Sequence, residues 1–132
     1  MALELRHYQS GRISWRSLQF PVELNGRRIT ALIDTGAQRT TITAKAAESI
    51  GVTDAMLGAG RAITVRGIAG EQLSSRLHMF SQLKIGDLVI RKPEIVVANV
   101  NLKAADMVLG LDLLRTRRFW LSHRARQIFI SN

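Results

Sequence analysis

Cysteine is absent from the 132-residue sequence, which therefore has no disulfide, no thiol nucleophile and no thiolate metal site. No hydrophobic run approaches the length of a membrane span. The N-terminal sequence also lacks the apolar segment of a signal peptide. We therefore expect a soluble domain with no signal peptide or transmembrane segment. The sequence leaves its compartment open, and the domain can be part of a longer protein.

Acidic and aromatic residues are both scarce. Ten Asp and Glu residues stand against 19 Lys and Arg, and the formal net charge of +9 favours acidic partners or anionic surfaces. However, aromatic residues make up only 5% of the chain, too few for an obvious base-stacking platform. Most arginines are also spread along the sequence. This composition argues against nucleic-acid binding as the main function and favours a solvated basic surface.

One apolar stretch ends abruptly in a carboxylate. Residues 29–33 are typical of a core strand, and Asp34, Thr35 and Gly36 follow directly. An ionised carboxylate that is buried without a partner costs several kcal/mol, so we expect Asp34 to emerge into a cleft or to meet a partner. Gly36 allows a tight turn and a close approach of other groups, and Thr35 can brace the loop. We interpret Asp34 as catalytic, with a plain strand-to-turn corner as the structural alternative.

Residues 34–37, with the apolar run before them, resemble the active-site motif of the retropepsin-like aspartic proteases. The resemblance is closest to the retroviral-protease-like domain of the Ddi proteins. Residues 106–115 are similar to the apolar-apolar-glycine segment and helix of that family, in the expected order. The resemblance implies an all-β fold with one or two short helices, a single closed, barrel-like lobe, and a homodimer. We expect this domain over residues 13–132, after an N-terminal extension of residues 1–12.

The first half of the chain predicts a hairpin that delivers Asp34. Partial alternation over residues 13–24 predicts a strand or a bent pair of strands, with Pro21 at an edge or a bend. Asn25 and Gly26 predict a type I′ turn, and the chain returns over residues 28–33. Residues 40–43 predict a strand, residues 44–50 a helix with Thr43 as its N-cap, and residues 53–60 a loop.

A glycine-rich tip separates the strands predicted at residues 62–66 and 71–80. In retropepsin-like proteases a similar hairpin is the flap that closes over bound peptide. The resemblance therefore implies that Ala37 and the tip residues contact substrate; the tip consists of Gly67, Ile68, Ala69 and Gly70. An ordinary surface hairpin is the alternative. The flap is favoured because Ile68 is an apolar residue that needs something beneath it.

The second half repeats the layout of the first, with a hairpin over residues 83–90, a strand over 94–100, an apolar pair with glycine, and a short helix. Leu109 and Gly110 stand where the first half has Asp34, Thr35 and Gly36, so each chain supplies one catalytic aspartate. Asp112 falls in the first turn of the predicted helix, where a carboxylate stabilises the helix dipole, and we interpret it as structural. Residues 118–121 and 127–130 predict closing strands.

Other chemistries fit less well. Ser74, Ser75 and His78 show no nucleophile elbow. The three histidines are scattered and lack carboxylates at ligand spacing, so no metal is expected. The Gly58-Ala59-Gly60 segment lacks the spacing of a dinucleotide site. We expect no cofactor.

Peptide hydrolysis by paired carboxylates needs one ionised group and one protonated group. A single Asp34 does not serve as both, whereas a twofold homodimer brings two copies together. The sequence therefore predicts an aspartic endopeptidase that acts as a homodimer on protein or peptide substrates, with Thr35 and Gly36 supporting the active-site loops. The alternative is a catalytically weak dimerisation or peptide-binding module.

Overall fold

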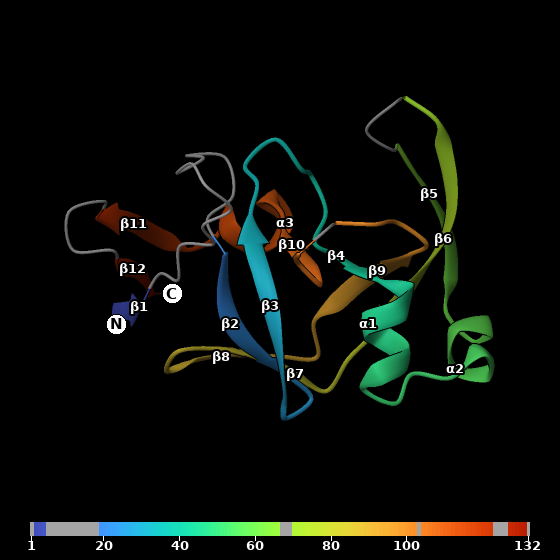
Figure 1. Ribbon diagram of the computed structural model, residues 1–132, viewed down its shortest axis with the longest axis horizontal. Helices are drawn as coiled ribbons and strands as arrows, with labels where there is room; N and C mark the ends of the chain where they lie inside the picture. The colour runs from blue at the N-terminus through green and yellow to red at the C-terminus, as the bar shows by residue number, and fades with distance from the viewer. Residues whose placement is uncertain (1, 5–18, 67–69, 103, 123–126, 132) are drawn as a thin grey trace.

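The computed structural model describes residues 2–4, 19–66, 70–102, 104–122 and 127–131 (Figure 1). Within these ranges the chain is mainly β, as the sequence predicts. The strands are β1 (Ala2–Glu4), β2 (Gln19–Leu24), β3 (Arg27–Ile33), β4 (Thr41–Thr43), β5 (Arg61–Arg66), β6 (Gln72–Met79), β7 (Gln82–Ile85), β8 (Leu88–Arg91), β9 (Glu94–Ala98), β10 (Met107–Leu109), β11 (Arg118–Ser122) and β12 (Gln127–Ser131). The helices are α1 (Ala44–Ser49), α2 (Asp54–Gly58) and α3 (Leu111–Leu114).

Two sheets contain these strands. The large sheet has nine strands in the order β5-β6-β9-β4-β10-β3-β2-β7-β8, and the small sheet has the order β1-β12-β11. The large sheet does not close: β5 and β8 lie at opposite ends of this order. The expectation of a closed barrel is therefore wrong for the described part of the chain. In Figure 1 the β5–β6 hairpin lies at the right of the molecule and β8 lies at the left, which agrees with their places at the two ends of the sheet.

The β2–β3 hairpin forms as its turn residues predict. Asn25 and Gly26 both have positive φ angles, 51° and 78°, which a type I′ turn requires. Phe20, Val22 and Leu24 are buried at alternate positions of β2, which places one face of the strand on the core. β2 is an interior strand of the sheet, so Pro21 is not on an edge strand. However, β2 pairs with β7 only at Glu23 and Leu24, so Pro21 lies outside the stretch that is paired with β7. Residues 13–18 of the predicted first strand lie outside the described residues.

Strand β10 occupies the middle of the large sheet. It runs parallel to β3, with Met107 opposite Ala31 and Leu109 opposite Ile33, and antiparallel to β4. Met107 and Leu109 are almost fully buried. A three-residue strand that is paired on both sides and buried in the core holds a well-defined position. The two halves of the chain therefore meet directly at the ends of β3 and β10.

One local prediction is wrong. Residues 53–60 were expected to be a loop, but α2 forms within them, and the Thr53 hydroxyl accepts a hydrogen bond of 3.2 Å from the Met56 N–H. Thr53 and Asp54 are a cap residue and a first-turn acidic residue, which together favour a helix start. The nearby glycines concealed this signal in the sequence. By contrast, Thr43 caps α1 as predicted.

The N-terminal end of the predicted domain lies only partly within the described residues. The predicted boundary between residues 12 and 13 falls within residues 5–18, which lie outside the described part. Strand β1 of the predicted extension pairs antiparallel with β12. None of the described helices is long and apolar enough to cross a membrane.

Candidate active site

Asp34 is the first residue after β3, and its side chain is exposed. Its N–H donates to the Leu109 carbonyl (3.2 Å) at the end of the neighbouring strand β10. Its carbonyl accepts from the Ala37 N–H (3.1 Å), which closes a tight turn. Because β10 is packed in the core and pairs with β3, the position of the Asp34 backbone is set by the sheet while its side chain is exposed.

Gly36 holds the Asp34 carboxylate. Its N–H donates to Asp34 Oδ1 at 2.8 Å. A Cβ atom at Gly36 would lie 3.1 Å from the same oxygen, which is closer than most real contacts of a Cβ. Glycine therefore leaves room for the carboxylate to bind the backbone N–H. This contact orients one oxygen of Asp34 and leaves the other free of protein donors among the described residues.

The rest of the Asp34 loop is bound to the start of α3. Leu111 donates its N–H to the Ala37 carbonyl (2.8 Å), and Asp112 donates its N–H to the Gln38 carbonyl (3.1 Å). The first N–H groups of a helix have no partner within the helix. Here the loop carbonyls accept from them, so the start of α3 and the Asp34 loop stabilise each other.

A side-chain network at Thr40 completes this link. Thr40 is fully buried, and it donates to Asp112 Oδ1 from both its N–H (2.9 Å) and its hydroxyl (2.7 Å). The same hydroxyl accepts from the Gly110 N–H at 3.1 Å. These contacts confirm the structural interpretation of Asp112. By contrast, the Asp34 carboxylate bonds only within its own loop among the described residues.

Two hollows adjoin the Asp34 loop. The one that includes Asp34 has a volume of about 320 Å³ and is lined on its apolar side by Val65, Leu73, Val100 and Val108. The other has a volume of about 590 Å³ and extends from Gly36 to Arg66 at the end of β5. Five residues border both, so the two hollows adjoin each other; these are Ala37, Arg39, Thr41, Val65 and Arg66.

The structure brings together some of the predicted site residues. Asp34 and Ala37 both line the smaller hollow, and Gly36 lines the larger one. Gly70 is exposed, with a φ of 85°, but borders neither hollow. Thr35 is exposed, and its hydroxyl has no hydrogen-bond partner in the described ranges. Gly67, Ile68 and Ala69 lie outside the described residues.

Sequence reasoning missed three residues of this region. Thr40 was expected only as a strand residue, yet it bonds to α3; its position six residues after Asp34 gave no local signal. Arg39 and Arg66 were counted only as surface charge, yet both border the hollows beside Asp34. These two arginines belong to segments that only the folded sheet brings together.

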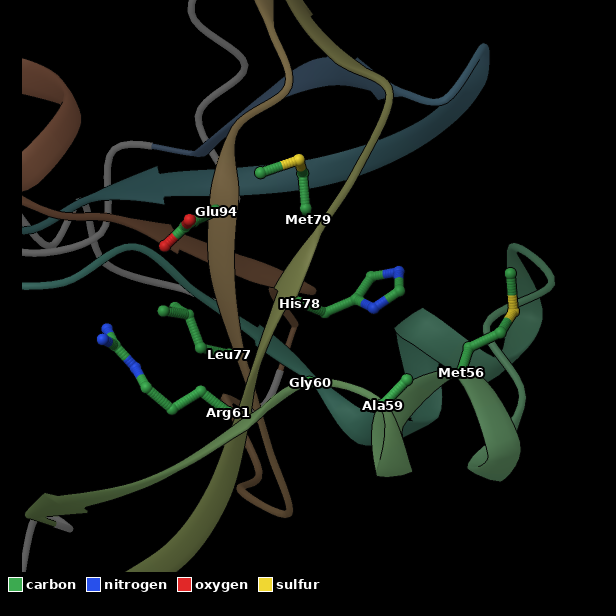
Figure 2. A pocket seen from close by; sticks show the side chains of 8 residues that line it. All are labelled: Met56, Ala59, Gly60, Arg61, Leu77, His78, Met79 and Glu94. Carbon is green, nitrogen blue, oxygen red and sulfur yellow. The ribbon is translucent and has the colours of Figure 1, made fainter.

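A third hollow, of about 440 Å³, lies at the other end of β5 and contains none of the predicted site residues (Figure 2). Met56, His78 and Met79 line it together with Arg61 and Glu94. Met56 and Met79 are exposed, and the ring of His78 packs edge-on against Phe80 with centroids 4.7 Å apart. The described residues contain no group of three His, Asp or Glu side chains that could hold a metal ion.

Comparison with known families decides where this site belongs. The sequence profile of the family described as "gag-polyprotein putative aspartyl protease" matches residues 20–116, which include both the Asp34 loop and α3. The chain belongs to this family. The retropepsin-like assignment from residues 34–37 and 106–115 is therefore confirmed.

Relatives and solved structures of this family agree with the fold. DNA damage-inducible protein 1 of Chaetomium globosum is 34% identical over 98 residues, which cover 74% of this chain but only 21% of that protein. A retropepsin-like aspartic protease from Rickettsia conorii matches with a TM-score of 0.69 and 17% identity, over 98% of this chain and 88% of that one. The retroviral protease-like domain of Ddi1 from Leishmania major matches with a TM-score of 0.60 and 21% identity, over 90% of this chain and 91% of that one. The chain thus spans about a fifth of the length of the Chaetomium relative.

Proposed function

We propose that the chain is an aspartic endopeptidase that is active as a homodimer and cleaves extended polypeptide segments. The observation that carries the proposal is the setting of Asp34: an exposed carboxylate on a loop fixed by β10 and α3, held by the Gly36 N–H, and open to a hollow. The family supports aspartyl protease chemistry at this position. Among the described residues the Asp34 carboxylate bonds only to Gly36 within its own loop, so the joining of the two halves of the chain does not require it.

Dimerisation supplies the second carboxylate. Two Asp34 side chains that face each other across a twofold axis share one proton, because two close carboxylates do not both ionise readily. The ionised Asp34 takes a proton from water while the protonated one donates to the scissile carbonyl. The water oxygen bonds to the carbonyl carbon. The carbon–nitrogen bond then breaks as the amine receives the proton that the first Asp34 took from water, and a hydroxyl proton of the intermediate returns to the other Asp34. Thr35 is exposed beside Asp34, and we assign its hydroxyl and Gly36 to contacts between the two loops.

Substrate binding uses the cleft beside Asp34. Strand β5 is an edge strand of the large sheet, so an extended peptide can add to it through backbone hydrogen bonds. We propose that the β5–β6 hairpin is a flap whose tip, residues 67–70, closes over the peptide. Ala37, which borders both hollows, contacts the peptide from the opposite side.

A cleavage assay with Asp34→Asn tests the proposal. A mixed peptide library is incubated with each protein from acidic to neutral pH, and products are identified by mass spectrometry. We expect wild-type protein to cleave peptides and Asp34→Asn to be inactive while its circular dichroism and its dimer are unchanged. Equal activity of the two proteins would remove Asp34 from the mechanism. Binding of peptides without cleavage by wild type would instead favour the dimerisation or peptide-binding module.

Sedimentation tests the assembly. The proposal requires a dimer at the concentration at which the protein cleaves. A monomer at micromolar concentration that retains proteolysis would contradict it.

A further inference from the structure

We propose that Arg39 and Arg66 make this cleft selective for polypeptides with an acidic side chain near the bond that is cut. The inference rests on the proposed function, since it names the substrate class of the same cleft. It depends on one arrangement in this chain, namely two arginine side chains at the larger hollow.

The larger hollow is lined by side chains that donate hydrogen bonds to an anion. Arg39 and Arg66 border it together with Gln38 and Thr64, whose side chains also carry donors; Thr41 borders it too, but its hydroxyl donates to the Arg39 carbonyl. Among the described residues, no carboxylate lines this hollow. A volume of about 590 Å³ is ample for a glutamate or aspartate side chain.

The two arginines are available for such a contact. Both side chains are exposed, and neither guanidinium is paired with a carboxylate in the described ranges. Arginine stays charged under all ordinary conditions and binds a carboxylate through two parallel N–H donors. Because an unpaired arginine has no intramolecular bond to break, binding an acidic side chain costs no lost contact within the protein.

The hollow that contains Asp34 has a different character. Asp34 and Glu71 both line it, and these carboxylates repel an incoming anion. Arg39 and Arg66 border it as well, but here the two carboxylates offset their charge, and Leu73, Val100 and Val108 add an apolar wall. We therefore expect the substrate to place an apolar side chain next to Asp34, at the bond that is cut. The acidic side chain of the substrate then lies further along the peptide, at the larger hollow.

Arg61 is a matched control for the two arginines. It is exposed and lies on the same strand as Arg66, at the other end of β5. It borders the third hollow together with Glu94, and Figure 2 shows both side chains extending to the same side of the ribbon. Substituting Arg61 therefore removes the same charge from β5 without changing either hollow beside Asp34.

The test measures cleavage of matched peptides. The best substrate from a mixed library is resynthesised with Glu, Gln or Lys at each position on either side of the bond, and kcat/KM is measured at low salt. We expect Glu to exceed Gln at one position by roughly two- to fivefold, the range of exposed charge pairs, and Lys to be poorest. Arg39→Gln and Arg66→Gln should each reduce this ratio toward one, whereas Arg61→Gln should preserve it. The double variant Arg39→Glu with Arg66→Glu should favour Lys, and added salt should weaken every preference.

The inference and the proposed function fail in different ways. Equal cleavage of Glu and Gln peptides at every position, or the same loss of preference in Arg61→Gln as in Arg39→Gln, would overturn the inference and leave the protease intact. If wild type cleaves nothing, the proposed function fails, and the library is then tested for binding to the Asp34→Asn protein. Enrichment of acidic peptides by the Asp34→Asn protein, lost when Arg39→Gln and Arg66→Gln are introduced into it, would sustain the inference. Absence of this enrichment would refute it.

Discussion

Thr40 and Asp112 lie 72 positions apart in the sequence and are joined by two hydrogen bonds. Both bonds end on one oxygen of Asp112, and the Thr40 hydroxyl also accepts from the Gly110 N–H. This pair connects the end of the Asp34 loop to the first turn of α3. The position of the candidate catalytic carboxylate therefore depends on a contact that does not itself include Asp34.

Thr40→Val should destabilise the fold. Valine has nearly the same shape, but the buried Gly110 N–H then loses its acceptor, which costs about 1–3 kcal/mol. The free energy of unfolding from urea titrations measures this loss. Thr40→Ser keeps the hydroxyl and should lose only about 1 kcal/mol from the deleted methyl group. A Thr40→Val protein as stable as wild type would show that the network contributes nothing.

A double-mutant cycle isolates the contact between the two residues. Thr40→Val and Asp112→Ala should be non-additive in the free energy of unfolding, with a coupling of about 0.5–3 kcal/mol. Thr41→Val is the control, because the Thr41 hydroxyl donates to the Arg39 carbonyl (3.2 Å) and not to Asp112. Its effect should add to that of Asp112→Ala. Additivity in both cycles would contradict the proposed link.

Gly110→Ala should be more severe than an ordinary substitution of glycine. A Cβ at Gly110 would lie 2.6 Å from the Arg39 carbonyl carbon and 2.9 Å from the Thr40 nitrogen. These are backbone atoms, so the Asp34 loop must move, and we expect a loss of about 1–3 kcal/mol. Gly58→Ala is the control, since nothing lies within 4 Å of the added carbon. Thermal unfolding of both variants should show a lowered midpoint only for Gly110→Ala.

Local features of the fold were predictable because each has a local physical cause. The turn at Asn25 and Gly26 follows from their tolerance of positive φ, and the cap at Thr43 follows from its hydroxyl before a run of helix-forming residues. Helix α2 was missed because Gly58 and Gly60 outweighed the weaker cap signal at Thr53. The exit of Asp34 from the core was predictable from the change of residue type alone.

Long-range features were predictable only in outline. The repeated layout indicated that residues 108–110 correspond to the Asp34 segment, and the parallel pairing of β10 with β3 places them side by side. Nothing in the sequence indicated that Thr40 would reach Asp112, because a hydroxyl and a carboxylate so far apart carry no mutual pattern. The open sheet also differed from expectation, since closure depends on whether β5 and β8, strands far apart in the sheet order, meet in the folded chain.

Asn25→Ala should weaken the β2–β3 hairpin for two reasons. Asn25 has a φ of 51°, which alanine adopts poorly, and its Oδ1 accepts from the N–H groups of Ser81 (2.7 Å) and Gln82 (3.2 Å). Asn25→Gly removes the side-chain hydrogen bonds but tolerates the positive φ. The difference in stability between the two variants therefore measures the cost of the positive φ for alanine. We expect urea unfolding to rank Asn25→Ala below Asn25→Gly by about 1 kcal/mol. The reverse order would show that the turn adopts another conformation.

Gly36→Ala should separate activity from stability. The added Cβ would lie 3.1 Å from Asp34 Oδ1, and Asp34 is exposed, so the carboxylate can move without disturbing the core. Because displacement of a reacting group by about 1 Å can cost roughly a hundredfold in rate, we expect kcat to fall by about 10–100-fold. The free energy of unfolding should change by less than about 1 kcal/mol, as for surface substitutions. Gly58→Ala, on α2 and far in sequence from the Asp34 loop, should retain full activity. A Gly36→Ala protein with normal kcat would show that the bond between the Gly36 N–H and Asp34 Oδ1 does not position the catalytic group. The case for a catalytic Asp34 would then depend on the Asp34→Asn variant alone.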